Sequence, residues 1–126
     1  MAVILVVEDD PDNQELVTRF LKREGHSVLH AEDGEAGVIA AKAHLPAMVV
    51  MDLGLPGMDG WEAAKRIRSS PETAHIPILA LTASTLSESV FKAREVGIDA
   101  YETKPVAYLR LMKKIEQLVR APRPLP

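Results

Sequence analysis

Five runs rich in apolar, often β-branched residues alternate along the chain with longer amphipathic stretches. The first, third and fourth runs are almost wholly apolar, which is typical of parallel strands buried on both faces. The second run mixes in polar residues and suits an edge of the sheet. The alternation therefore predicts an α/β fold, a parallel sheet with helices on both faces. The expected strands are 3–7, 27–31, 47–51, 77–81 and 98–102, and the expected helices are 11–24, 34–44, 60–69, 86–96 and 106–120.

The start of the first helix carries a clear local signal. Asp10 belongs to the residue types favoured at an N-cap, and Pro11 has the backbone angle that suits the first helical position. An apolar stripe of helical spacing then continues as far as Gly25, a residue type that commonly ends helices. These signals fix the first helix at both of its ends.

The bulk composition fits a single domain. The chain has 126 residues, 47% of them hydrophobic, so it can bury a core without cross-links. It has no cysteine, which excludes disulfides, thiolate metal sites and a cysteine nucleophile. We assign the domain to residues 1–120. The proline-rich residues 121–126 form a tail, either a frayed terminus or the stub of a linker.

Hydropathy and charge narrow the possible partners. No apolar run approaches the roughly 18 residues of a membrane span, and the start of the chain has no signal-type segment. We therefore expect a cytoplasmic protein without membrane contact. The net charge is −3 and the basic residues are dispersed rather than clustered, which argues against binding to nucleic acid.

Asp52 is the residue that points most directly to chemistry. It follows the third apolar run and opens a loop rich in Gly and Pro, and open α/β sheets bind ligands at such strand ends. Right-handed crossovers bring the carboxyl ends of parallel strands to one edge, so Asp52 should meet Asp9, Thr82 and Lys104. Taken alone, an Asp or a Lys at such a place is usually a turn residue or a solvated charge. Four such residues at the ends of successive strands indicate a functional site.

The expected cluster of carboxylates needs a cation, because neighbouring carboxylates repel one another. Mg²⁺ suits an all-oxygen site and commonly binds one or two carboxylates together with phosphate oxygens. Beside such an ion, the carboxylate of Asp52 could act as a nucleophile toward phosphorus and form an aspartyl phosphate. Lys104, the Thr82 hydroxyl and the backbone N–H of Ala83 could then stabilise the added negative charge.

Five short motifs stand at the predicted strand ends in a fixed order. They are Glu8-Asp9-Asp10, Met51-Asp52-Leu53, Pro56-Gly57-Met58-Asp59-Gly60, Leu81-Thr82-Ala83 and Lys104-Pro105. The series closely resembles the receiver domain of two-component response regulators, and the match covers about residues 3–119. Single-domain regulators of the kind that act in cell-cycle phosphorelays look most similar.

The resemblance implies a role for each matching residue. Asp52 would accept a phosphoryl group from a phosphohistidine on a sensor histidine kinase or a histidine phosphotransfer protein. Asp9, Asp52 and the backbone carbonyl of Gly54 would bind Mg²⁺ directly, and Glu8 would act through metal-bound water. Mn²⁺ is expected to substitute for Mg²⁺. The resemblance also implies a flavodoxin-like sheet of order 2-1-3-4-5 and a cis peptide bond before Pro105.

The resemblance further makes Thr82 and Tyr101 the expected switch residues. Phosphorylation would draw the Thr82 hydroxyl toward the phosphoryl group, and Tyr101 would rotate into the space left behind. Alternatively, Tyr101 is a half-buried strand aromatic with no switching role. A downstream protein would recognise the change on the fourth helix, fifth strand and fifth helix, roughly residues 86–119. The chain would be a signalling module, monomeric or weakly dimeric, that catalyses only its own phosphorylation and dephosphorylation.

Two positions near the expected phosphoacceptor bear on how long the phosphoryl group would persist. Gly54 has no side chain and Ser84 has a short one, where longer polar groups in the family often orient a hydrolytic water. We therefore expect slow self-dephosphorylation.

Other functions fit the residues less well. A phosphohydrolase with an aspartyl nucleophile would need a general acid two positions after it, where this chain has Gly54. A flavin- or nucleotide-binding module would need glycines and free N–H groups after the first strand, where this chain has carboxylates. A receiver-shaped scaffold that takes no phosphate is disfavoured by the complete set of site residues.

Overall fold

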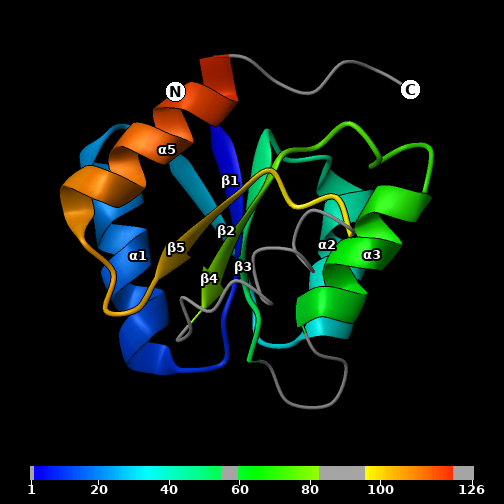
Figure 1. The fold of residues 1–126 in the computed structure, drawn as a ribbon, viewed down its shortest axis with the longest axis horizontal. Coiled ribbons are helices and arrows are strands. Elements are labelled where there is room, and N and C mark those ends of the chain that lie inside the picture. The colour runs from blue at the N-terminus through cyan, green and yellow to red at the C-terminus, as the bar shows by residue number, and fades with distance from the viewer. Residues whose placement is uncertain (1, 55–59, 83–95, 121–126) are drawn as a thin grey trace.

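The structure, a computed structural model, describes residues 2–54, 60–82 and 96–120, and its five strands form one parallel sheet (Figure 1). The strand order is β2-β1-β3-β4-β5, which confirms the order that the resemblance implied. The strands are β1 Val3–Val7, β2 Ser27–Ala31, β3 Met48–Asp52, β4 Ile78–Thr82 and β5 Ala100–Thr103. The described helices are α1 Pro11–Arg23, α2 Gly34–His44, α3 Gly60–Ser69 and α5 Tyr108–Arg120. The helix predicted over 86–96 falls, up to residue 95, outside the described residues.

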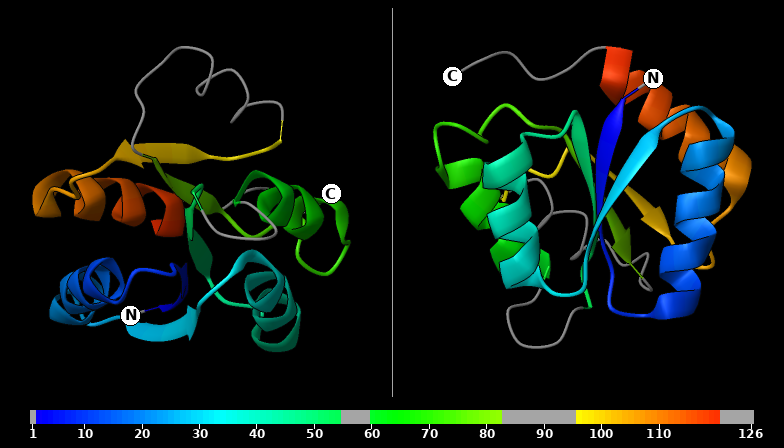
Figure 2. Two further views of the ribbon diagram at one scale, coloured as in Figure 1. Left: turned by 90° about the horizontal axis from the view of Figure 1, so that it is seen from below. Right: turned by 180° about the vertical axis from the view of Figure 1, so that it is seen from behind.

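The helices cover both faces of the sheet, α1 and α5 on one face and α2 and α3 on the other (Figures 1 and 2). Alternate residues of each strand feed the two resulting cores. In β1, Ile4 and Val6 pack toward α1 and α5, whereas Leu5 and Val7 pack toward α2 and α3. No helix in these described ranges is long and apolar enough to cross a membrane.

Most predicted boundaries agree with the structure to within two residues. The Asp10 side chain accepts a hydrogen bond from the Asp12 N–H at 3.0 Å, and Pro11 begins α1, so the predicted cap is confirmed. β3 and β4 run one residue further than predicted, which makes Asp52 and Thr82 the last residues of their strands. β5 begins two residues later than predicted, and α5 begins at Tyr108 rather than at residue 106.

Gly60 allows α3 to begin directly against the end of β3. A Cβ atom added at Gly60 would lie 2.2 Å from the backbone oxygen of Asp52 and 2.6 Å from the Cα of Leu53. No larger residue fits there without moving the backbone. The glycine therefore lets the helix pack close to the strand end that carries Asp52.

Strand β5 lies at an edge of the sheet and is held at its start by an ion pair. The Arg68 guanidinium of α3 contacts the Asp99 carboxylate at 3.0 Å, and it also donates to the carbonyl oxygens of Gly97 and Ile76 at 2.8 and 2.9 Å. The Asp99 carboxylate in turn accepts the Ile78 N–H at 2.8 Å. This network fixes the segment before β5 to both α3 and β4.

Glu102 is a buried acid in the middle of β5, only 4% exposed. Its carboxylate contacts Nε of Arg110 at 3.0 Å and Nζ of Lys114 at 2.9 Å, both on α5. Burial alone would raise the pKa of Glu102, but the interactions with Lys114 and Arg110 outweigh burial and lower it. The ionised carboxylate therefore links β5 to α5 through ion pairs.

We expect Glu102→Gln to destabilise the fold at neutral pH by about 1–3 kcal/mol, the usual cost of losing a charge-assisted buried contact. A lowered folded-state pKa gives stability that is present above the ordinary value of 4.5 and is lost as the pH falls through the folded pKa. The difference between wild type and variant should therefore shrink in acid. Urea unfolding at pH 7 and at successively lower pH measures it. Glu116→Gln, which removes only an exposed partner of Arg120, is the control and should change little.

Candidate functional site

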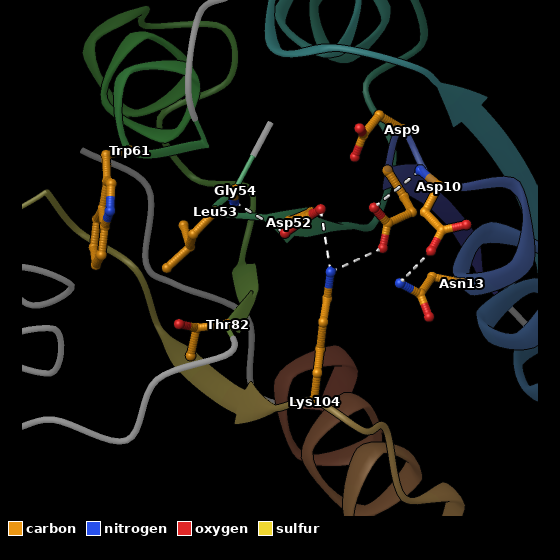
Figure 3. Close-up of a pocket in the computed structure, with 10 residues that line it drawn as sticks. Asp9, Asp10, Asn13, Asp52, Leu53, Gly54, Trp61, Thr82 and Lys104 are labelled. Carbon is orange, nitrogen blue, oxygen red and sulfur yellow. Dashed lines mark hydrogen bonds and ion pairs between the residues drawn. The ribbon is translucent and has the colours of Figure 1, made fainter. Parts of the chain in front are cut away.

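The residues predicted to share one sheet edge do so (Figure 3). Asp52 ends β3, Glu8 and Asp9 follow β1 directly, Thr82 ends β4 and Lys104 follows β5. All five line one pocket, although they are spread over almost a hundred positions of sequence. The parallel topology brings them together, because every strand of the sheet runs in the same direction.

The ammonium of Lys104 is the centre of the site. Its Nζ lies 3.2 Å from Oδ2 of Asp52 and 3.3 Å from Oε1 of Glu8. The other carboxylate oxygen of Asp52 accepts the Gly54 N–H at 3.0 Å. Both oxygens of Asp52 are therefore held, and the residue is only 4% exposed. The carboxylate has a fixed orientation toward the pocket.

The electrostatics of the site favour an ionised Asp52. Burial and the neighbouring Asp52 raise the pKa of Glu8 to about 7. Burial acts in the same sense on Asp52, but hydrogen bonds from Glu8 and the Gly54 N–H, together with the charge of Lys104, lower its pKa overall. The two carboxylates raise the pKa of Lys104 in spite of its burial. Of the two buried acids, Asp52 is therefore the one that stays charged beside the ammonium.

The acidic residues also fit a divalent cation. Glu8, Asp9 and Asp52 each place a carboxylate oxygen within 4.8 Å of the others. Asp9 is exposed, whereas Oε1 of Glu8 is buried, with the Lys104 ammonium 3.3 Å away. Three carboxylates this close together, two of them buried, form a group of hard oxygen ligands that a Mg²⁺ ion and its waters would fit.

The two expected switch residues lie on neighbouring strands. Thr82 is 9% exposed and lines the pocket, and Tyr101 is half-buried and packs against the core under α2 and α3. The peptide bond before Pro105 is cis, as the resemblance implied. Ala83, whose N–H was expected to bind the phosphoryl group, lies outside the described residues, as does Ser84.

Further side chains that were not predicted to belong to the site also line the pocket: Asp10, Asn13, Leu53 and Trp61. The Asn13 amide donates to the Asp10 carboxylate at 3.1 Å. Because Asn13 follows Asp10 by three residues, the helical spacing alone could have placed both on one face. Trp61, the only tryptophan of the chain, was interpreted as a packing residue, and it both packs against the core and borders the pocket.

Comparison with known proteins identifies the family. The sequence pattern of the response regulator receiver domain matches residues 4–116. The chain belongs to the response regulator receiver domain family. Its fold is therefore the CheY-like fold of receiver domains, and the chain is a module of two-component signalling. The motifs at the strand ends and the strand order of the sheet agree with this assignment.

Individual receiver proteins resemble the chain over nearly its whole length. PilH of Pseudomonas aeruginosa is 34% identical over 119 residues, which are 94% of this chain and 98% of PilH. The polar-differentiation response regulator DivK of Brucella anthropi is 28% identical, with 90% of this chain and 92% of DivK covered. The receiver domain of a Pseudomonas aeruginosa sensor histidine kinase has a TM-score of 0.88 and 30% identity, with 95% of this chain and 98% of that domain covered. That structure holds a magnesium ion in its active site cleft.

We expect Mg²⁺ to change the fluorescence of Trp61, because this side chain borders the pocket that contains the acidic group. Asp9→Asn changes one of the three carboxylates that could hold the ion and should weaken Mg²⁺ binding by at least about tenfold. Asp12→Asn is the matched control, since Asp12 is an exposed acid of α1 that does not line this pocket. Equal Mg²⁺ affinity in wild type and Asp9→Asn would contradict the assignment of the metal ligands.

Proposed function

We propose that this receiver domain is a phosphoacceptor switch in which Asp52 takes a phosphoryl group from a phosphohistidine on a partner protein, in the presence of Mg²⁺. One observation carries the proposal. The ammonium of Lys104 contacts Asp52 at 3.2 Å beside the Glu8 and Asp9 carboxylates, at the open end of the sheet. Nucleophile, cationic partner and metal ligands therefore stand within one pocket.

Transfer would proceed by displacement at phosphorus. A carboxylate oxygen of Asp52 forms the new P–O bond, the P–N bond to the donor imidazole breaks, and the imidazole nitrogen keeps the electron pair and takes up a proton. Asp9, Asp52 and the backbone carbonyl of Gly54 would hold Mg²⁺ directly, and Glu8 would act through metal-bound water. When bound, Mg²⁺ neutralises charge that develops on the transferring oxygens. The chain supplies an Asp52 that is already ionised and oriented.

The phosphorylated state would be stabilised by groups that already line the pocket. Lys104 can contact a phosphoryl oxygen from its present place, and the Thr82 hydroxyl is at the pocket wall to donate a hydrogen bond. The Ala83 N–H is proposed as a second donor. Movement of Thr82 would leave space for Tyr101 to rotate. Phosphorylation of Asp52 would in this way alter the surface that the downstream protein recognises.

The partners follow from this chemistry. The phosphoryl donor would be a sensor histidine kinase or a histidine phosphotransfer protein. The downstream target would be a protein that binds the surface of residues 86–119. The net charge is −3 and the basic residues are dispersed along the sequence rather than clustered. We therefore propose that the signal is passed on by contacts with proteins rather than by binding to nucleic acid.

Intact mass after incubation with acetyl phosphate and Mg²⁺ tests the chemistry. Wild type should gain the mass of one phosphoryl group, and Asp52→Asn should gain none, because an amide is not a nucleophile here. Asp12→Asn, with the same change on an exposed acid of α1, should behave like wild type. A phosphorylated Asp52→Asn protein, or an unmodified wild type with Mg²⁺ bound, would refute the proposed function.

The phosphorylated form should persist for minutes or longer, and Gly54→Glu should shorten its lifetime by about tenfold, because a carboxylate there can orient an attacking water. Within residues 2–54, 60–82 and 96–120, a Cβ at Gly54 would meet Oδ1 of Asp52 alone, at an ordinary 3.7 Å. Loss of the phosphoryl mass after removal of the donor gives the lifetime. A wild-type lifetime of seconds would contradict the expectation. Unchanged Mg²⁺ affinity in the variant would exclude a distorted site.

A further inference from the structure

Lys114 of α5 makes three contacts with strand β5. Its Nζ donates to the backbone oxygen of Tyr101 at 2.6 Å, contacts the Glu102 carboxylate at 2.9 Å and lies 5.6 Å from the centre of the Tyr101 ring. The ammonium therefore contacts both the main chain and the aromatic side chain of the expected switch residue. Tyr101 stands three residues before Lys104 on the same segment.

The position of Lys114 is itself fixed. Glu102 is buried and holds Nζ through an ion pair, and Arg110, one turn earlier on α5, contacts the other oxygen of the same carboxylate at 3.0 Å. β5 is an edge strand whose neighbour on one side is β4. On its other side, Lys114 satisfies a main-chain carbonyl that would otherwise be open to solvent or to another chain.

We propose that Lys114 holds Tyr101 in its resting position and so sets the balance between the resting and phosphorylated arrangements of the switch. This inference rests on the proposed function, because it assigns a positioning residue to the same switch. The contact is specific to the resting state. If the Tyr101 ring rotates, it leaves the ammonium, and Lys114 cannot follow because Glu102 holds it.

The size of the effect follows from the kind of contact. A cation over an aromatic ring at a partly exposed site shifts an equilibrium between two positions of that ring by about two- to fivefold. Removing the ammonium should favour the rotated position by that factor. By linkage, a phosphoryl mimic that favours the rotated position should then bind more tightly by the same factor.

Fluorine NMR of protein labelled with 3-fluorotyrosine can follow the ring directly. The chain has two tyrosines, so two signals are expected, and Tyr108→Phe assigns them. Wild type, Lys114→Met and Lys113→Met are titrated with beryllium fluoride, a stable phosphoryl mimic, in the presence of Mg²⁺. Lys113 is the matched control, because it is the neighbouring, exposed lysine of α5 and the removed charge is the same.

The expected result is a Tyr101 signal that moves with beryllium fluoride in all three proteins, with half-saturation in Lys114→Met at a two- to fivefold lower concentration than in the other two. The inference would be overturned if the half-saturating concentration were equal in all three proteins, or if it fell by the same factor in both lysine variants. Either outcome would leave the proposed function intact. A Tyr101 signal that does not move in wild type would refute the switch role of Tyr101, and the inference with it.

Loss of Lys114 also removes one partner of the buried Glu102 carboxylate, which could prevent folding. The double variant Glu102→Gln/Lys114→Met avoids this, because it leaves no buried charge short of a partner. It should still bind beryllium fluoride more tightly than Glu102→Gln/Lys113→Met, because Lys114 keeps its contacts with Tyr101 in that control. The factor should be smaller than for the single variant, because the ion pair with Glu102 no longer fixes Lys114. Identical half-saturation in these two double variants would count against the proposal.

Discussion

The arrangement of the site depends on one partly buried cation. The ammonium of Lys104 lies between the carboxylates of Asp52 and Glu8, at 3.2 and 3.3 Å, where both acids are almost fully buried. Without that charge, two carboxylates in a poorly solvated place would both favour protonation. The ammonium lowers the pKa of both acids, but at Glu8 burial and the neighbouring Asp52 outweigh it and raise the pKa to about 7. The Gly54 N–H, which donates to Asp52 at 3.0 Å, adds to the charge of Lys104 and favours Asp52 as the acid that carries the negative charge.

This contact constrains the rest of the sheet, because its three members come from β1, β3 and the end of β5. Lys104 can reach across only if β5 keeps its register with β4 and if β3 ends beside β1. The pairing of Asp52 with Leu81 and of Thr82 with Thr103 places these ends level with one another. The close approach of Gly60 to the Asp52 carbonyl then lets α3 cover the same end. Asp52 therefore meets two requirements at once: its backbone allows the close approach of Gly60, and its carboxylate contacts Lys104.

The apolar runs were sufficient to predict a parallel sheet with helices on both faces, and this topology placed Asp52, Asp9, Thr82 and Lys104 at one edge. The strand order followed from the family resemblance of the motif series, and the structure confirms it. Boundaries differed where pairing extends past the apolar run, as at Asp52, which is polar yet belongs to β3. Glu102 was missed for another reason. A single acid in a strand looks like an exposed edge residue, and its partners Arg110 and Lys114 are recognisable only once α5 is packed against β5.

Strand β5 differs from the other strands near the site in what holds it. β3 and β4 are buried along their whole length, whereas of the four residues of β5 only Glu102 is fully buried. Charged contacts take over: Arg68 with Asp99 before the strand, α5 cations with Glu102 within it, and Lys104 with Asp52 after it. Ion pairs respond to a new charge more than apolar packing does, and a phosphoryl group on Asp52 would compete directly for Lys104, the cation of this set that lines the pocket. A strand positioned in this way is suited to report a change at Asp52, and a strand buried on both faces is not.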